Sequence, residues 1–265
     1  MRLAGWLFLF LATLLTAKVL IGQPQDAKAM LEAVARRYEG AKTLVLTGTV
    51  VNVTRSPQQE VTVTNRFTVH IQRPNRFRVV VEVALPQGGK QRQLFVADGR
   101  FLFVEYPHLK QVLKRPLASK NASLPVPFAA FWHTDTLLAR IKEAHIEGKE
   151  TVQGRPAQRI RVVTTDGTVA QIWVADNIIW QVRATVDGKR LVRQTPTKSD
   201  QPNPFIEAMK QTTFTTTIKF GRVNFNVSLP AGMFAYKPPV GFKVVEALQM
   251  PSNAMAPLPS PSAKP

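Results

Sequence analysis

The fold class is read most directly from residues 61–85, whose sequence is VTVTNRFTVHIQRPNRFRVVVEVAL. Apolar and polar residues alternate on both sides of Pro74, and this period of two is typical of half-buried β-strands. The apolar side carries Val63, Phe67, Val69, Phe77, Val79, Val81 and Val83. The other side of the second strand carries Arg76, Arg78 and Glu82. These residues predict two long antiparallel strands with one apolar and one charged face.

The same alternation extends outward in both directions. A strand over 44–54 precedes this pair, and a hairpin over 92–106 follows it, with Asp98-Gly99 as its tight turn. Five further short-linked strands are predicted within 146–195, separated by Gly, Asp-Gly and Asp-Asn turns. Residues 212–229 add one or two more. The sequence thus predicts a mainly β (α+β) domain over 26–250, a curved antiparallel sheet or half-open barrel of about 10–11 strands.

Two helical segments interrupt the strands. Residues 26–39, DAKAMLEAVARRYE, have apolar residues on one helical face, with Asp26 to cap the start and Gly40 to end it. Between His108 and Glu147 the strand period is lost, and a short helix is expected from about Thr134 to Ala144. We expect the N-terminal helix and this midchain helical lid to cover the concave face of the sheet, because no other element is available.

Both ends of the chain differ from its middle. Residues 1–22 contain the apolar run LAGWLFLFLATLL after Arg2, which is the layout of a signal peptide. Cleavage is expected after Ala17 or Gly22, and an uncleaved membrane anchor is the alternative. Either way, a periplasmic or extracytoplasmic location is predicted. Residues 251–265 contain five prolines and are expected to form a disordered tail.

Composition excludes several classes of chemistry. The chain has no cysteine and only four histidines, so thiolate and histidine-rich metal sites lack ligands. No phosphate-binding glycine loop and no helical zinc motif occurs. We therefore expect no metal, no cofactor and no catalytic residue. A third possible function, a hydrolase acting on envelope polysaccharide, has no motif in its favour.

The formal net charge of +18 points to an anionic partner. The basic residues are spread along the predicted strands, and no segment is typical of a DNA-reading helix, so no nucleic acid partner is expected. For an exported protein, the anionic envelope surface is the more natural partner.

The candidate site is an apolar cavity. The midchain aromatic residues, bounded by prolines, are interpreted as a flap over the concave face, where acyl chains would be sheltered. Ordinary core packing is the alternative interpretation of the same residues. The predicted cavity residues are Phe67, Val69, Phe77, Val79, Val81, Phe101, Phe103, Phe128, Phe131, Trp132, Trp173 and Trp180.

The order of elements over residues 26–246 resembles the bacterial outer-membrane lipoprotein carrier (LolA-like) superfamily. Three features carry the resemblance: Gly154 before a basic strand, Ile172-Trp173-Val174 before an Asp-Asn turn, and the phrase from Phe225 to Gly232. The resemblance implies a half-open curved sheet closed by helices, with an apolar cavity for acyl chains. It also implies roles in the transport, chaperoning or sorting of lipoproteins, and, for other members, in envelope-stress regulation or glycolipid transport.

Two functional hypotheses follow. The first is a noncatalytic exported carrier that binds lipid or lipoprotein acyl chains in the concave cavity. The alternative is an envelope sensor or scaffold of the same fold that binds a membrane or periplasmic protein partner.

Overall fold

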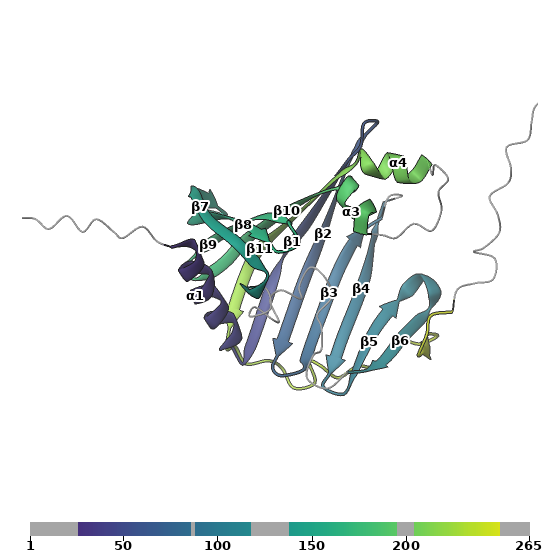
Figure 1. Cartoon of the computed structure of the whole chain (residues 1–265). Helices are drawn as coiled ribbons and strands as arrows, with labels where there is room; N and C mark the ends of the chain where they lie inside the picture. The colour runs from purple at the N-terminus through teal and green to yellow at the C-terminus, as the bar shows by residue number, and fades with distance from the viewer. Residues whose placement is uncertain (1–25, 86–87, 118–137, 195–203, 250–265) are drawn as a thin grey trace, which may run out of the picture.

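The computed structural model describes residues 26–85, 88–117, 138–194 and 204–249. Twelve strands of these residues form one strongly curved sheet, in the order β12-β6-β5-β4-β3-β2-β1-β11-β10-β9-β8-β7 (Figure 1). The strands are β1 (Thr43–Arg55), β2 (Glu60–Gln72), β3 (Arg76–Ala84), β4 (Lys90–Asp98), β5 (Phe101–Tyr106), β6 (Gln111–Pro116), β7 (Ile141–Val152), β8 (Arg155–Thr164), β9 (Val169–Ala175), β10 (Ile178–Asp187), β11 (Thr213–Phe225) and β12 (Lys243–Val245). The helices are α1 (Ala27–Glu39), the short 3-10 helix η1 (Pro107–Leu109), α3 (Gly188–Gln194) and α4 (Pro204–Lys210).

The predicted curved antiparallel sheet is confirmed, with twelve strands. Neighbours along the chain pair as antiparallel hairpins, and β1 joins the two runs of strands because it also pairs with β11. The last strand, β12, pairs with β6 in parallel, which the sequence did not predict.

The concave face is apolar along complete rows of cross-strand neighbours. One row crosses six strands and consists of Val223, Leu46, Val69, Val79, Phe95 and Val104. The predicted pairing of faces is confirmed, since Phe67 lies opposite Val81 and Val69 opposite Val79. Side chains that face one another across a sheet share a face, so the hydrophobic pattern sets the register.

Helix α1 packs against one end of this concave face. The carboxylate of Asp26 accepts a hydrogen bond from the backbone N–H of Lys28 at 3.0 Å, which satisfies a free donor of the first turn. Met30, Leu31 and Val34 are buried in the core, and the ring of Tyr38 meets that of Phe225 edge-on at 5.1 Å. The predicted helix and its cap are therefore confirmed.

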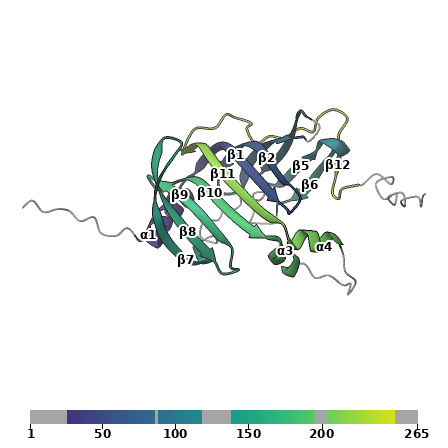
Figure 2. The same cartoon turned by 90° about the horizontal axis from the view of Figure 1, so that it is seen from above.

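The convex face of β3–β6 is covered by the C-terminal segment, residues 226–248. Figure 2 shows this segment running along the outer side of the sheet. Phe234 is buried, and the ring of Tyr236 lies 4.8 Å from that of Phe103. The segment ends in β12 beside β6, so the outer face of this half of the sheet also has a packed layer.

Two predicted elements are wrong. The strand expected over 189–195 is largely helix α3, because the carboxylate of Asp187 accepts from the N–H of Lys189 at 2.8 Å and begins a helix. The helix expected to reach Ala144 stops earlier, since β7 begins at Ile141 and pairs with β8. Helix α4 was not predicted.

The predicted signal peptide and proline-rich tail lie outside the described residues. No helix among the described residues has the length and apolar character needed to cross a membrane.

Candidate functional site

Four of the predicted cavity residues form the centre of the hydrophobic core. Phe67, Val69, Phe77 and Val79 are at most 3% exposed, and all point to the concave face. Val81, one row farther from α1, is only half-buried and packs against this cluster. The inner part of the concave face is therefore core, and its outer part begins at Val81.

The two predicted tryptophans of β9 and β10 are also buried. The indole N–H of Trp173 donates to Glu150 Oε2 at 2.7 Å, and this carboxylate also pairs with Arg159. The guanidinium of Arg155 lies 4.0 Å from the ring centre of Trp180. These contacts hold both tryptophans in fixed positions at the β7–β10 end of the sheet.

Phe101, Phe103 and Trp173 do not lie on the concave face with Phe67, Val69, Phe77 and Val79. Trp173 is opposite Gln181 on β10, and Gln181 is opposite the exposed Lys219 on β11, so Trp173 belongs to the convex face. Phe103 is opposite Val96 on β4, and Val96 is opposite Arg78 on β3, so Phe103 belongs to the convex face. Phe101, two residues away, lies on the same face with Lys114 Nζ 4.0 Å from its ring. The concave residues of β5 are Leu102, opposite Ala97, and Val104, opposite Phe95. The prediction was wrong here because both faces of β5 are apolar, and alternation alone does not distinguish them.

The predicted flap lies outside the described residues. It comprises Phe128, Phe131 and Trp132.

The outer part of the concave face offers apolar surface beyond the core. Val81, Phe95 and Leu102 are half-buried on β3–β5, and Val182 is half-buried on β10. They line the same side of one continuous sheet, at the rim of the buried cluster. This is the surface that could contact an apolar ligand without displacing the core.

A second candidate site, which sequence reasoning missed, lies on the convex face. A pocket of about 700 Å³ opens between β3–β5 and the C-terminal segment, lined by Arg78, Leu85, Lys90, Gln91, Arg92, Leu94, Glu105, Pro107, His108, Ala235, Tyr236, Lys237 and Pro239. The hydroxyl of Tyr236 donates to Glu105 Oε1 at 3.0 Å. Burial raises the pKa of Tyr236, and the hydrogen bond to Glu105 raises it further. The alternation in the sequence places Arg78 and Arg92 on the outward face of their strands. The contact of Tyr236 with Glu105, 131 residues away in the chain, has no signal in the sequence.

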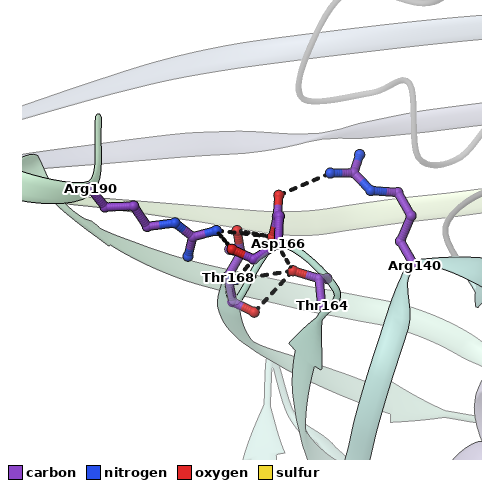
Figure 3. A network of polar contacts seen from close by, with 5 residues as sticks. All are labelled: Arg140, Thr164, Asp166, Thr168 and Arg190. Carbon is purple, nitrogen blue, oxygen red and sulfur yellow. Dashed lines mark hydrogen bonds and ion pairs between the residues drawn. The ribbon is translucent and has the colours of Figure 1, made fainter. Parts of the chain in front are cut away.

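A polar network fixes the tip of the β8–β9 hairpin (Figure 3). Asp166 Oδ1 accepts hydrogen bonds from the hydroxyl of Thr164 at 2.5 Å, and from the hydroxyl and N–H of Thr168 at 2.8 and 3.0 Å. Arg140 and Arg190 each approach its carboxylate to 3.0 Å. The hydrogen bonds from Thr164 and Thr168 hold the pKa of Asp166 well below its ordinary value. The network ties α3 to the hairpin through Arg190. Each of its side chains already has a partner within the network, so the network has a structural role.

Among the described residues, no group of three His, Asp or Glu side chains is arranged to hold a metal ion. The arrangements that the structure does provide are an apolar concave face and a basic convex pocket, and both are suited to binding.

A curved antiparallel sheet open along one side, with a helix at one end of its concave face, defines an open β half-barrel. The chain itself belongs to the DUF2092 family, described as predicted periplasmic protein, whose model matches residues 27–248. The protein is accordingly periplasmic, as the sequence predicts. A search of curated proteins found no match.

Several solved structures are similar to this chain. An uncharacterized conserved protein from Thermus thermophilus is 11% identical with a TM-score of 0.44, over 83% of this chain and 99% of that one. The MucA/MucB complex from Pseudomonas aeruginosa gives 16% identity and a TM-score of 0.39, over 80% of this chain and 61% of that one. A LolA superfamily protein, NE2245 from Nitrosomonas europaea, is 12% identical with a TM-score of 0.33, over 79% of this chain and 97% of that one.

Proposed function

We propose that this protein is a noncatalytic periplasmic carrier that shelters the acyl chains of a lipid or lipoprotein against the outer part of its concave face. The observation that carries the proposal is the apolar surface left at the rim of the core. Val81, Phe95 and Leu102 continue the buried rows of β2–β4 outward and keep part of their surface exposed.

The size of the concave face supports this role. Helix α1 is 13 residues long and packs at one end of a sheet of twelve strands. Strand β1 alone has 13 residues, which at roughly 3.3 Å per residue is about 40 Å, whereas a helix of 13 residues is about 20 Å long. A helix of this length covers only about half the length of such a strand, so α1 leaves apolar strand surface beyond its own reach. Each acyl methylene buried there contributes about 0.8 kcal/mol.

The first experiment is native mass spectrometry of the exported, untagged chain, followed by organic extraction and lipid analysis. The carrier hypothesis predicts a stoichiometric acyl species in the extract. An empty protein that instead retains a membrane or periplasmic protein would favour the sensor or scaffold alternative.

A matched pair of variants locates the binding surface. Val80 and Val81 are adjacent on β3, both half-buried, and point to opposite faces of the sheet. Val81→Asn places an amide on the concave face and should weaken binding of a fluorescent fatty acid about tenfold, which corresponds to roughly 1.4 kcal/mol. Val80→Asn puts the same group on the convex face and should leave the affinity within about twofold.

Thermal unfolding of both variants controls for loss of structure. If Val80→Asn weakened fatty-acid binding as much as Val81→Asn at similar stability, acyl chains would not be bound on the concave face.

A further inference from the structure

The convex pocket holds an excess of positive charge. Four of its lining residues are cations, namely Arg78, Lys90, Arg92 and Lys237, and its one carboxylate is Glu105. That carboxylate already accepts the hydroxyl hydrogen of Tyr236. Within the described ranges, no carboxylate forms an ion pair within 4 Å of the guanidinium of either arginine.

Arg78 is poorly compensated at its position. It is half-buried on β3, and its Nη1 donates a long hydrogen bond of 3.5 Å to the carbonyl of Met233, its one side-chain hydrogen bond to the part of the chain that the structure describes. Burial lowers the pKa of Arg78 and the positive charge of Arg92 lowers it further, and the opposing effects of Glu105 and Tyr236 do not cancel this decrease. A bound anion would offset both the desolvation of Arg78 and its repulsion from Arg92.

The shape of the pocket indicates more than a simple ion. Its volume of about 700 Å³ is of the size that holds small organic molecules. Leu94, which is buried, contributes an apolar wall, and so does Pro107. The planar guanidinium group of arginine presents pairs of N–H donors that match two phosphate oxygens, and it forms charge-assisted hydrogen bonds with them.

We propose that this pocket binds a phosphate group carried on a small organic moiety, with the phosphate between Arg78 and Arg92 and the organic part against Leu94 and Pro107. The site lies on the face of the sheet opposite the proposed acyl-binding surface. The phosphate-binding proposal therefore does not depend on the proposed carrier function.

Isothermal titration of the full exported chain with inorganic phosphate and with glycerol 3-phosphate tests the proposal, together with sedimentation on phosphatidylglycerol vesicles. We expect saturable binding of at least one probe, weakened at least about tenfold in R78Q/R92Q. Binding of glycerol 3-phosphate would identify a soluble organic phosphate as ligand. Arginine-dependent binding to vesicles alone would identify a lipid headgroup.

The matched control is K219Q/R222Q, which removes two exposed cations from β11 on the same convex face. It should change the affinity by less than about twofold. If R78Q/R92Q fails to fold, Arg92→Gln alone replaces it, because Arg92 is exposed. The proposal is overturned if the wild-type chain binds none of the three probes saturably, or if the control loses as much affinity as the pocket variant.

Discussion

At the scale of single residues, Gly48 has the most restrictive environment in the central strands. The pairing of β1 with β11 shifts register between Thr47 and Gly48, so that Gly221 lies between the two paired positions of β11. This bulge brings β11 against Gly48, where a Cβ atom would lie 2.0 Å from the carbonyl oxygen of Lys219 and 2.8 Å from Phe67 Cζ. Only a residue without a side chain fits between the Lys219 carbonyl and the ring of Phe67.

Gly48→Ala should therefore lower the free energy of unfolding by about 3 kcal/mol, because strand backbones must move apart to admit one methyl group. Urea denaturation followed by circular dichroism measures the change. Gly221→Ala is the control, since its Cβ would meet nothing closer than 3.9 Å, and it should stay within about 0.5 kcal/mol of wild type. Equal losses in the two variants would contradict this account of the bulge.

The site residues show what a sequence reveals at this scale. Val69 and Val79 were assigned correctly to the apolar face, because Thr68 and His70 flank Val69 and the alternation of Arg76, Arg78 and Glu82 sets the period of two in β3. In β5, Phe101, Leu102, Phe103 and Val104 are consecutive apolar residues. The face of each depends on the pairing with β4, which is a property of the folded sheet. Phe101 and Phe103 were therefore placed in the wrong layer.

At the scale of elements, α3 shows how a turn residue changes the outcome. Residues 187–195 look like a turn and a strand, yet Asp187 caps a helix, and the N–H of Gly188 donates to the carbonyl of Thr212 at 2.8 Å. Local alternation located the long strands because each buries one face. It did not identify α3, whose capping side chain and distant backbone partner decide its structure.

The Asp166 network makes a testable contribution to the same region. The pKa of Asp166 is depressed in the folded chain. The stability that the Asp166 carboxylate contributes to the fold is therefore complete above its ordinary pKa of 3.8, and it is lost as pH falls through and below that value. Asp166→Asn should lower the melting temperature at about pH 7 by about 2–4 °C, the shift that roughly 1 kcal/mol produces in a domain of this size. The exposure of the carboxylate keeps the effect small.

Near pH 2.5 the carboxylate of the unfolded chain is protonated, whereas the folded chain still holds it ionised, so the difference between wild type and Asp166→Asn should shrink. Asp176→Asn, in the β9–β10 turn, is the control, because its carboxylate accepts no hydrogen bond from the described residues. A melting-temperature difference that stays constant from neutral to acid pH would show that Asp166 acts through something other than its charge.

At the scale of the whole molecule, the seam between β1 and β11 unites two local meanders. β2–β6 and β7–β10 are each built of neighbouring hairpins, whereas Asn52 and Thr216, joined by a hydrogen bond of 2.9 Å across the seam, are 164 residues apart. Such a pairing carries a large loop-closure cost and has no local sequence signal. The hydrophobic core crosses the seam without interruption, from Phe67 to Phe220, whose rings lie 5.7 Å apart.

Because one core spans both meanders, the sheet should unfold as one cooperative unit. In a chain with Trp6 and Trp132 replaced by Phe, fluorescence reports only Trp173 and Trp180, both in the second meander. Its urea midpoint should coincide with that of circular dichroism, which reports all strands. Gly48→Ala, at the seam, should move both midpoints downward together. If the tryptophans kept their wild-type midpoint while the circular dichroism transition shifted, the meanders would be separate folding units and the seam only a contact between them.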